Sequence, residues 1–267
     1  MKAIITAAGY GTRLLPATKE IPKEMLPIPY HGSFKPVIQI VFEQLFHIGI
    51  RDFIIIVGRG KRVIEDHFTP DYLFTKYLDS KYKIKESNEL KEFYNMLEQS
   101  DITWINQLDR RGFGDAVLRA EPFAGDDFLI VAADHIPRDL PMMPPQSILI
   151  TKVDDPKNYG VVVLDKNGTI IDIQEKPEKP KTNLIVMPYY RFDSRIFKFL
   201  HEVKPDKNNE IQLTQAIKKM IEENVKIKGI RINKAYDLGN IEKYVKAYKE
   251  LGRQPIKNKK EEQKIKK

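Results

Sequence analysis

The sequence predicts an α/β protein in which helices flank a mixed, mainly parallel sheet. Two observations carry this prediction. Short apolar runs, typical of strands buried on both faces, recur through the first half of the chain, and stretches of helical spacing separate them. With 267 residues, 42% of them hydrophobic, the chain also has enough apolar surface for one sizeable core. A strand–helix–strand rhythm of this kind favours a doubly wound sheet.

In the first half, apolar runs and helical patterns alternate. We expect strands at 3–8, 53–57, 102–105 and 128–131, and helices at 37–46, 62–68 and 115–120. No helical period appears before Lys35, so a long loop should follow the first strand. Residues 71–100 are polar, charged and helical in pattern, which predicts an excursion on the surface.

The second half changes character, with more strands than helices. Strands are expected at 147–153, 161–164, 170–174, 184–192 and 227–232, and helices at 196–202, 211–224 and 241–251. Asn167-Gly168 is a typical hairpin turn between two of these strands. No internal repeat and no Gly/Ser-rich linker divides the chain. We therefore expect one domain over residues 1–252, whose two halves share one sheet.

The net charge is +8, and much of the excess lies in a basic tail, residues 253–267. This tail has no aromatic residue to stack on a base and few apolar residues. We expect a solvated, disordered terminus rather than a tether for nucleic acid or an anionic surface. The remaining positive charge suits an enzyme that gathers phosphorylated substrates, and we expect no nucleic-acid partner.

Composition argues against several classes of function. The chain has no cysteine, so disulfides and thiol chemistry are absent, which suits the cytoplasm, where we expect the protein. No apolar run is long enough to span a membrane, so no membrane partner is expected. The five histidines show no zinc-ligand spacing, and no Gly-x-Ser-x-Gly motif supports acyl transfer.

The first expected strand runs directly into a loop that suits phosphate binding. Gly9 and Gly11 let backbone N–H groups approach phosphate oxygens, and Arg13 and Lys23 add cations that can neutralise a polyphosphate. Leu14 stands where a dinucleotide fingerprint needs its third glycine, and no Gly-Lys-Ser/Thr occurs for a Walker loop. The loop therefore predicts a phosphate site of another kind.

A second loop follows the strand expected at 102–105. The Gln107 amide offers both a donor and an acceptor to a uracil or thymine edge, and Gly112 and Gly114 let the backbone approach a flat base. An ordinary loop between a strand and a helix would show the same residues. The pattern by itself leaves these two interpretations equally open.

Two aspartates stand at the ends of separate segments. Asp134 follows the strand expected at 128–131, at the edge where open parallel sheets bind ligands, and Asp237 precedes the last helix. Either could instead be a turn or helix-cap residue. Together they could hold one Mg²⁺, which takes few carboxylates and completes its coordination with phosphate oxygens and water.

Glu175-Lys176-Pro177 follows the strand expected at 170–174. A glutamate can accept hydrogen bonds from sugar hydroxyls, and a lysine can bind a phosphate. Charged residues before a proline are also common in surface turns, which is the alternative interpretation.

Several of these motifs together resemble the sugar-1-phosphate nucleotidyltransferases. The resemblance rests on the glycine pair, Thr12-Arg13, Pro22-Lys23 and the segments 59–68, 112–118 and 210–214, and it runs nearly end to end. It implies a Rossmann-like nucleotidyltransferase fold. It implies catalytic roles for Arg13, Lys23 and Asp134, nucleotide binding by Ala8, Gly9, Gly11, Thr12, Gln107 and Gly112, sugar-phosphate binding by Gly160, Glu175, Lys176 and Asn183, and Mg²⁺ binding by Asp134 and Asp237. His135 stands where relatives often carry a second acidic residue.

Within this family, the motifs are more similar to the uridylyltransferases than to the thymidylyltransferases. The resemblance implies transfer of a uridylyl group from UTP to glucose 1-phosphate, giving UDP-glucose and pyrophosphate. It also implies Mg²⁺ as cofactor and a homo-oligomer. Two alternatives stay open. One is thymidylyl transfer on the same fold, because uracil and thymine share the edge that Gln107 would read. The other is a nucleotide-sugar-binding regulator without catalysis.

Overall fold

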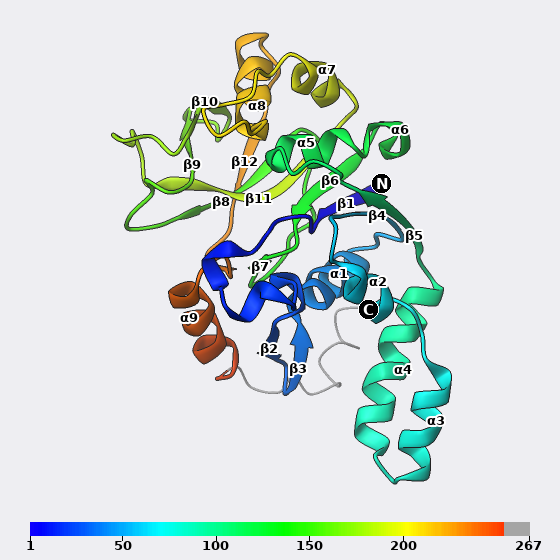
Figure 1. Ribbon diagram of the computed structural model, residues 1–267. Coiled ribbons are helices and arrows are strands. Elements are labelled where there is room, and N and C mark those ends of the chain that lie inside the picture. The colour runs from blue at the N-terminus through cyan, green and yellow to red at the C-terminus, as the bar shows by residue number, and fades with distance from the viewer. Residues whose placement is uncertain (254–267) are drawn as a thin grey trace.

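One nine-stranded sheet runs through the computed structural model, which describes residues 1–253 (Figure 1). Its strands are β1 (Lys2–Thr6), β4 (Asp52–Val57), β5 (Asp101–Asn106), β6 (Phe128–Ala132), β8 (Ser147–Lys152), β9 (Gly160–Leu164), β10 (Ile170–Glu175), β11 (Leu184–Phe192) and β12 (Lys228–Arg231). They lie in the order β10-β9-β11-β6-β1-β4-β5, and β8 pairs with both β11 and β12. Both halves of the chain thus share one sheet, as predicted.

The sheet is parallel in its first half and largely antiparallel in its second. β1 runs parallel to β4 and β6, and β5 continues this direction beside β4. β11 then pairs antiparallel with β6, β8 and β9. Residues 165–168 form the predicted turn between β9 and β10, with Gly168 at φ 76°, a left-handed value that glycine adopts without strain. The predicted α/β architecture is confirmed.

Helices cover both faces of the sheet (Figure 1). They are α1 (Val37–His47), α2 (Arg62–His67), α3 (Tyr72–Ser80), α4 (Ile84–Glu98), α5 (Gly112–Leu118), α6 (Glu121–Ala124), α7 (Arg195–His201), α8 (Leu213–Glu222) and α9 (Ile241–Leu251). Alternate residues of β1 enter opposite core clusters. Ile5 belongs to the cluster that includes residues of α1, α4 and α9, whereas Ile4 belongs to the cluster that includes residues of α5, α7 and α8.

Helices α3 and α4 project from the body as an antiparallel pair (Figure 1). They occupy the segment 71–100 that the sequence predicted as a surface excursion. Asp71 caps α3 by accepting a hydrogen bond from the N–H of Phe74 at 2.9 Å. Phe93 of α4 is buried in the core cluster beside Phe42 of α1, which anchors this pair of helices to the body.

Two small antiparallel sheets were not predicted. β2 (Pro27–Tyr30) and β3 (Ser33–Pro36) form a hairpin whose turn residues His31 and Gly32 both have positive φ, the geometry of a two-residue hairpin. β7 (His135–Pro137) pairs with β13 (Ala235–Asp237), about a hundred residues later in the chain. This second pairing matters because it brings Asp237 to the end of β6.

Other element boundaries differ slightly from the prediction. β1 ends at Thr6 rather than at residue 8, α5 begins at Gly112 rather than at 115, and α8 spans Leu213–Glu222. Three 3₁₀ turns, η1 (Thr12–Leu14), η2 (Ala17–Lys19) and η3 (Lys23–Met25), fill the loop after β1. The predicted basic tail, 253–267, lies outside the described residues except for Arg253.

Candidate active site

Loops that follow β1, β4 and β5 are tied together at the carboxyl edge of the parallel strands. Arg110, in the loop after β5, donates a hydrogen bond from Nη2 to the carbonyl of Arg59 in the loop after β4, at 2.7 Å. The same guanidinium lies 3.7 Å from the ring centroid of Tyr10, in the loop after β1. The predicted phosphate loop and the predicted base-reading loop are therefore neighbours, at the edge where open parallel sheets bind ligands.

Lys23 and Asp134 form an ion pair at this edge. Lys23 begins η3, and its Nζ donates a hydrogen bond to Oδ2 of Asp134, two residues after β6. The Asp134 residue is only 7% exposed. Burial alone would raise the pKa of the Asp134 carboxyl, but the Lys23 ammonium and the His135 imidazole hold that pKa well below its usual value. Asp134 is therefore an anion in the free protein.

The β7–β13 ladder places Asp237 beside the same group. Asp237 pairs in register with His135, the residue after Asp134. The His135 ring lies between the two aspartates, with Nδ1 2.8 Å from Oδ1 of Asp134 and Nε2 3.6 Å from Oδ1 of Asp237. The backbone N–H of Gly239 also donates to Oδ1 of Asp237 at 2.8 Å. Asp237 thus ends a strand, and Asn240, not Asp237, caps helix α9.

A second lysine pairs with Asp237. Nζ of Lys243, in the first turn of α9, donates to Oδ2 of Asp237 at 2.5 Å. Burial would raise the pKa of the Asp237 carboxyl, but His135 and Lys243 lower it below its usual value. Each of the two aspartates therefore carries its own ammonium partner, Lys23 on Asp134 and Lys243 on Asp237.

The donor chemistry of Asp134 and Asp237 suits Mg²⁺, which prefers oxygen ligands and usually keeps waters and substrate phosphates in its coordination sphere. Among residues 1–253, no group of three or more His, Cys, Asp and Glu side chains could hold a metal. A magnesium ion here would therefore use two carboxylates and complete its coordination with ligands from substrate and solvent. Lys23 and Lys243 would first have to leave those carboxylates.

Arg13 reaches this cluster from the loop after β1. A Cβ atom on Gly239 would lie only 3.1 Å from Nη2 of Arg13, so the guanidinium lies directly against the turn after Asp237. Gly11, at φ 72°, supplies the left-handed residue before η1. The nearest side-chain atoms to a Cβ on Gly9 would be Cε and Nζ of Lys23, at 3.7 and 3.8 Å. The structure thus brings Gly9, Arg13 and Lys23 together with the two aspartates.

The remaining residues predicted for nucleotide binding lie along the two loops. Ala8 is buried two residues after the end of β1, and Thr12 begins η1. Gln107 is buried, and its amide NH₂ donates both to the carbonyl of Gly112 at 3.2 Å and to Oδ2 of Asp115 at 2.7 Å. Both donor hydrogens are used within the chain, so any hydrogen bond from this amide to a base would have to be made by Oε1.

The requirement for glycine at 112 has a structural cause. Gly112 has φ 91°, and a Cβ there would lie 2.9 Å from Cβ of Glu210 and 3.0 Å from the carbonyl oxygen of Ile211. The N–H of Ile211 also donates to the carbonyl of Arg111 at 2.7 Å. Close packing of α5 against 210–211 therefore explains this glycine without a base. Its proposed role in base binding stays a prediction.

The residues predicted to bind the sugar phosphate lie on β9, β10 and the loops beside them. Glu175 pairs with Gly160 across the β9–β10 ladder, and Oε2 of Glu175 accepts a hydrogen bond from the Thr214 hydroxyl at 3.0 Å. Lys176 has φ 42°, and its N–H donates to the carbonyl of Tyr159 at 3.0 Å. A hollow of about 290 Å³ adjoins Glu175, lined by Ile173, Gln174, Glu175, Thr214, Gln215 and Lys218.

Among residues 1–253, Asn183 makes no hydrogen bond or ion pair with the other predicted site residues. It is exposed, and its backbone carbonyl accepts a hydrogen bond from the N–H of Val153 at 3.0 Å. Two residues that sequence reasoning missed, Thr214 and Lys243, do contact the predicted set. Thr214 is the second residue of the amphipathic helix α8 and lies in the segment 210–214 that carries the family resemblance, but no role was assigned to it. Lys243 lies in a helix rich in lysine, so no local signal marked it.

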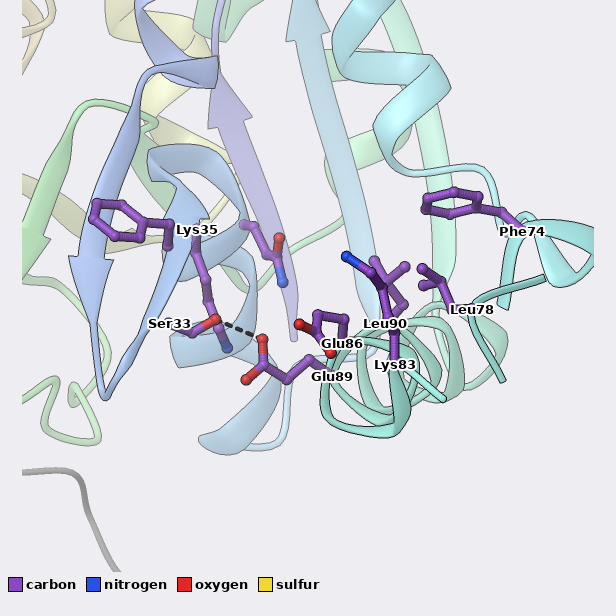
Figure 2. A pocket seen from close by; sticks show the side chains of 10 residues that line it. Ser33, Lys35, Phe74, Leu78, Lys83, Glu86, Glu89 and Leu90 are labelled. Carbon is purple, nitrogen blue, oxygen red and sulfur yellow. Dashed lines mark hydrogen bonds between the residues drawn. The ribbon is translucent and has the colours of Figure 1, made fainter. Parts of the chain in front are cut away.

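A separate cleft of about 310 Å³ lies away from these residues, between the β2–β3 hairpin and the α3–α4 pair (Figure 2). Ser33 spans it with a hydrogen bond to Oε2 of Glu89 at 2.7 Å. The other lining residues include Phe34, Phe74 and Leu78. None of the residues predicted for catalysis or substrate binding lines this cleft.

Comparison with known proteins identifies the family. The family model for nucleotidyl transferases matches residues 2–254. The chain is 34% identical to the Bacillus subtilis UTP–glucose-1-phosphate uridylyltransferase YngB, with 94% of this chain and 89% of that protein covered. It is 33% identical to a Methanocaldococcus jannaschii protein provisionally named as the same enzyme, with 94% and 93% covered. The chain belongs to the nucleotidyl transferase family, and it is a nucleotidyltransferase.

The solved structures give the same result for the fold. A UDP-glucose pyrophosphorylase in complex with UDP-glucose superposes with a TM-score of 0.80 at 33% identity, covering 93% of this chain and 97% of that one. The predicted family and its fold are confirmed.

Within the described part of the chain, no helix has both the length and the apolar content that a bilayer crossing requires.

Proposed function

We propose that this chain transfers a uridylyl group from UTP to glucose 1-phosphate, giving UDP-glucose and pyrophosphate. The observation that carries the proposal is the cluster in which Arg13, Lys23 and Lys243 surround Asp134 and Asp237, beside the Gly9 loop. Three permanent cations against two carboxylates leave a local excess of positive charge. Such a site favours polyanions, and both proposed substrates carry phosphate groups.

The proposed reaction is a single in-line displacement. A phosphate oxygen of glucose 1-phosphate attacks the α-phosphorus of UTP and forms a new P–O bond, while the bond from that phosphorus to the bridging oxygen of the β-phosphate breaks. Pyrophosphate leaves with the electron pair. No covalent enzyme intermediate is needed, so the protein contributes positioning and charge neutralisation. Arg13 and Lys23, beside the Gly9 loop, would neutralise the triphosphate and the charge that develops on the leaving group.

Mg²⁺ is the proposed cofactor, and when bound it would supply further charge neutralisation on the triphosphate. Asp134 and Asp237 would be its protein ligands. Lys23 donates directly to Asp134, and a Cβ atom on Gly9 would lie 3.8 Å from the same ammonium. Once its carboxylate partner is occupied by a metal, its ammonium would be free to bind phosphate oxygens.

The sugar phosphate is proposed to lie over β9 and β10. Glu175, fixed by the Thr214 hydroxyl, would accept hydrogen bonds from sugar hydroxyls. Lys176, held by its backbone bond to Tyr159, would bind the phosphate. The curated relatives and the complex with UDP-glucose support glucose as the sugar through their names. The absence of cysteine suits a cytoplasmic enzyme.

Thymidylyl transfer is the nearest alternative, since Oε1 of Gln107 could accept the N3–H of thymine as well as that of uracil. A screen for pyrophosphate release tests the proposal. Each nucleoside triphosphate is incubated with Mg²⁺ and with glucose, galactose, mannose or N-acetylglucosamine 1-phosphate. UTP with glucose 1-phosphate should give the fastest release.

A Lys23→Met variant, purified in the same way, controls for contaminating activity and should be nearly inactive. Faster release with another pair would reassign the substrates. The absence of release with every pair would leave a binding protein without catalysis.

A further inference from the structure

Lys243 lies between the two halves of the proposed site. Its Nζ is 2.5 Å from Oδ2 of Asp237 and 4.4 Å from the ring centroid of Tyr159. The side chain is 30% exposed, so it is only partly covered where it pairs with Asp237. Asn240 caps α9 through the N–H of Lys243, which fixes the backbone at this position. No motif in the sequence marked this residue.

Tyr159 places the Lys243 ammonium on the sugar-phosphate side. The carbonyl of Tyr159 accepts the N–H of Lys176, the residue predicted to bind the sugar's phosphate. The next residue, Gly160, pairs with Glu175. Lys23, in contrast, extends along Gly9 on the nucleotide side. Lys23 and Lys243 thus each pair with one of the two aspartates, but they lie on the sides proposed for different substrates.

We propose that Lys243 binds the phosphate of the sugar 1-phosphate when Asp237 has been taken by a divalent cation. The inference rests on the proposed function. In the free protein the ammonium neutralises Asp237. A dication on that carboxylate would repel Nζ, and an incoming phosphate dianion would offer charged acceptors to its N–H donors. Lys243 is then a second lysine, besides Lys176, on the acceptor phosphate.

The test measures binding rather than turnover. Calorimetry gives the Kd of glucose 1-phosphate for the protein saturated with Mg²⁺ and the non-hydrolysable analogue α,β-methylene-UTP. Lys243→Met should raise this Kd by roughly 10- to 100-fold, the effect of losing one charge-assisted hydrogen bond. The Kd of the nucleotide analogue should change by less than about threefold, and Lys243→Arg should recover most of the affinity. Lys246→Met is the matched control, because Lys246 is exposed on the same helix and the charge change is identical.

The outcomes separate this inference from the proposed function. If the wild-type protein binds glucose 1-phosphate and Lys243→Met binds it equally well, Lys243 only neutralises Asp237, and the inference is wrong while the function stands. An equal loss of affinity for the nucleotide analogue would move Lys243 to the nucleotide side and also overturn it. If the wild-type protein binds no sugar 1-phosphate, the proposed function fails and the inference fails with it.

Discussion

Lys61 and Glu24 form an ion pair that is almost wholly buried. Nζ of Lys61 lies 2.6 Å from Oε2 of Glu24, and the two side chains are 6% and 1% exposed. Burial is the main cause of two pKa shifts toward the neutral forms, upward for Glu24 and downward for Lys61. The pair joins the loop after β4 to the turn η3, and Glu24 directly follows Lys23 in that turn.

Breaking this pair on one side should destabilise the fold. Lys61→Met leaves the Glu24 carboxylate buried without its partner, and we expect a loss of about 3 kcal/mol in the free energy of unfolding, measured with urea. The double variant Lys61→Met/Glu24→Met should lose clearly less than the two single variants together, since both desolvation costs disappear. Arg62→Met is the control. Its ion pair with Asp66 is exposed, 89% and 68%, and should contribute less than about 0.5 kcal/mol. Equal losses in Lys61→Met and Arg62→Met would contradict the role of the buried pair.

His67 should make stability depend on pH. Burial lowers the pKa of the His67 ring from 6.5 to about 4. Below pH 6.5 the unfolded chain binds a proton that the folded chain does not, so stability is fully present above 6.5 and falls as the pH drops toward 4. The loss should reach about 2 kcal/mol at pH 5.

The measurement compares urea unfolding at pH 7.5 and pH 5. His67→Gln, which can keep a hydrogen bond to Gln39, should lose less stability on acidification than the wild type. The exposed His47 provides the control, and His47→Gln should follow the wild type. Identical pH dependence in the wild type and His67→Gln would show that His67 titrates normally.

Metal binding should depend on the nucleotide. Lys23 and Lys243 occupy the carboxylates of Asp134 and Asp237, so Mg²⁺ alone must displace two ammonium groups without a phosphate to receive them. We expect calorimetry to show weak Mg²⁺ binding to the free protein and much tighter binding with UTP present.

Activity should vanish with a chelator. Asp134→Asn and Asp237→Asn should each lower turnover by roughly 100-fold or more and reduce stability far less. The exposed Asp154→Asn should behave as wild type, and full activity in either site variant would rule out the metal assignment.

Lys176 should affect the acceptor more than the donor. Its backbone is fixed by Tyr159, and its side chain is 58% exposed beside Glu175. Lys176→Met should raise the KM for glucose 1-phosphate by roughly tenfold and leave the KM for UTP nearly unchanged, because only the acceptor's phosphate loses a partner. Lys179→Met, an exposed lysine three residues later, is the control. A larger effect on UTP would place Lys176 on the nucleotide side.

The elements that sequence reasoning found are those with a strong local pattern. The apolar runs around Ile4, Ile54 and Ile130 are buried on both faces of the sheet and were recognisable as strands. The β2–β3 hairpin was missed because Pro27, Pro29 and Pro36 argue against strands, although prolines are tolerated in the short edge strands of a hairpin. The three-residue strands β7 and β13 pair across about a hundred residues, and so short a segment has no period to detect.

The residues of the candidate site also differ in whether a local sequence pattern marks them. Arg13, Lys23 and Asp134 stand in motifs whose residue types indicate their chemistry. Their mutual contacts depend on long-range pairing that no local pattern contains. Lys243 contacts Asp237 because only residues 238–240 separate β13 from α9. The engagement of Gln107 with Asp115 could not be foreseen either, because it depends on how α5 begins.

The choice of nucleotide should depend on Oε1 of Gln107. Both hydrogens of its amide are donated, to Gly112 and to Asp115, and nothing in residues 1–253 donates to its Oε1. Uracil and thymine present an N3–H donor, which Oε1 can accept, whereas cytosine presents an acceptor at that position. We therefore expect UTP to be the best donor, dTTP a weaker second, and CTP poor. ATP and GTP should also be poor, because a purine presents a larger ring and a different edge.

How strongly the enzyme discriminates against each nucleotide depends on the physical cause of the discrimination. A site with a buried polar group left unpaired rejects a ligand strongly, whereas one methyl group is worth only about 1–3 kcal/mol. Specificity constants for the four ribonucleotides and dTTP, at fixed glucose 1-phosphate, measure both effects. Gln107→Leu should reduce the preference for UTP over CTP and leave the KM for glucose 1-phosphate unchanged, because the role proposed for Gln107 concerns only the base. If ATP or GTP gives the highest constant, both the uridylyl assignment and the base-reading role of Gln107 are wrong. If CTP equals UTP, the acceptor Oε1 does not contact the pyrimidine edge.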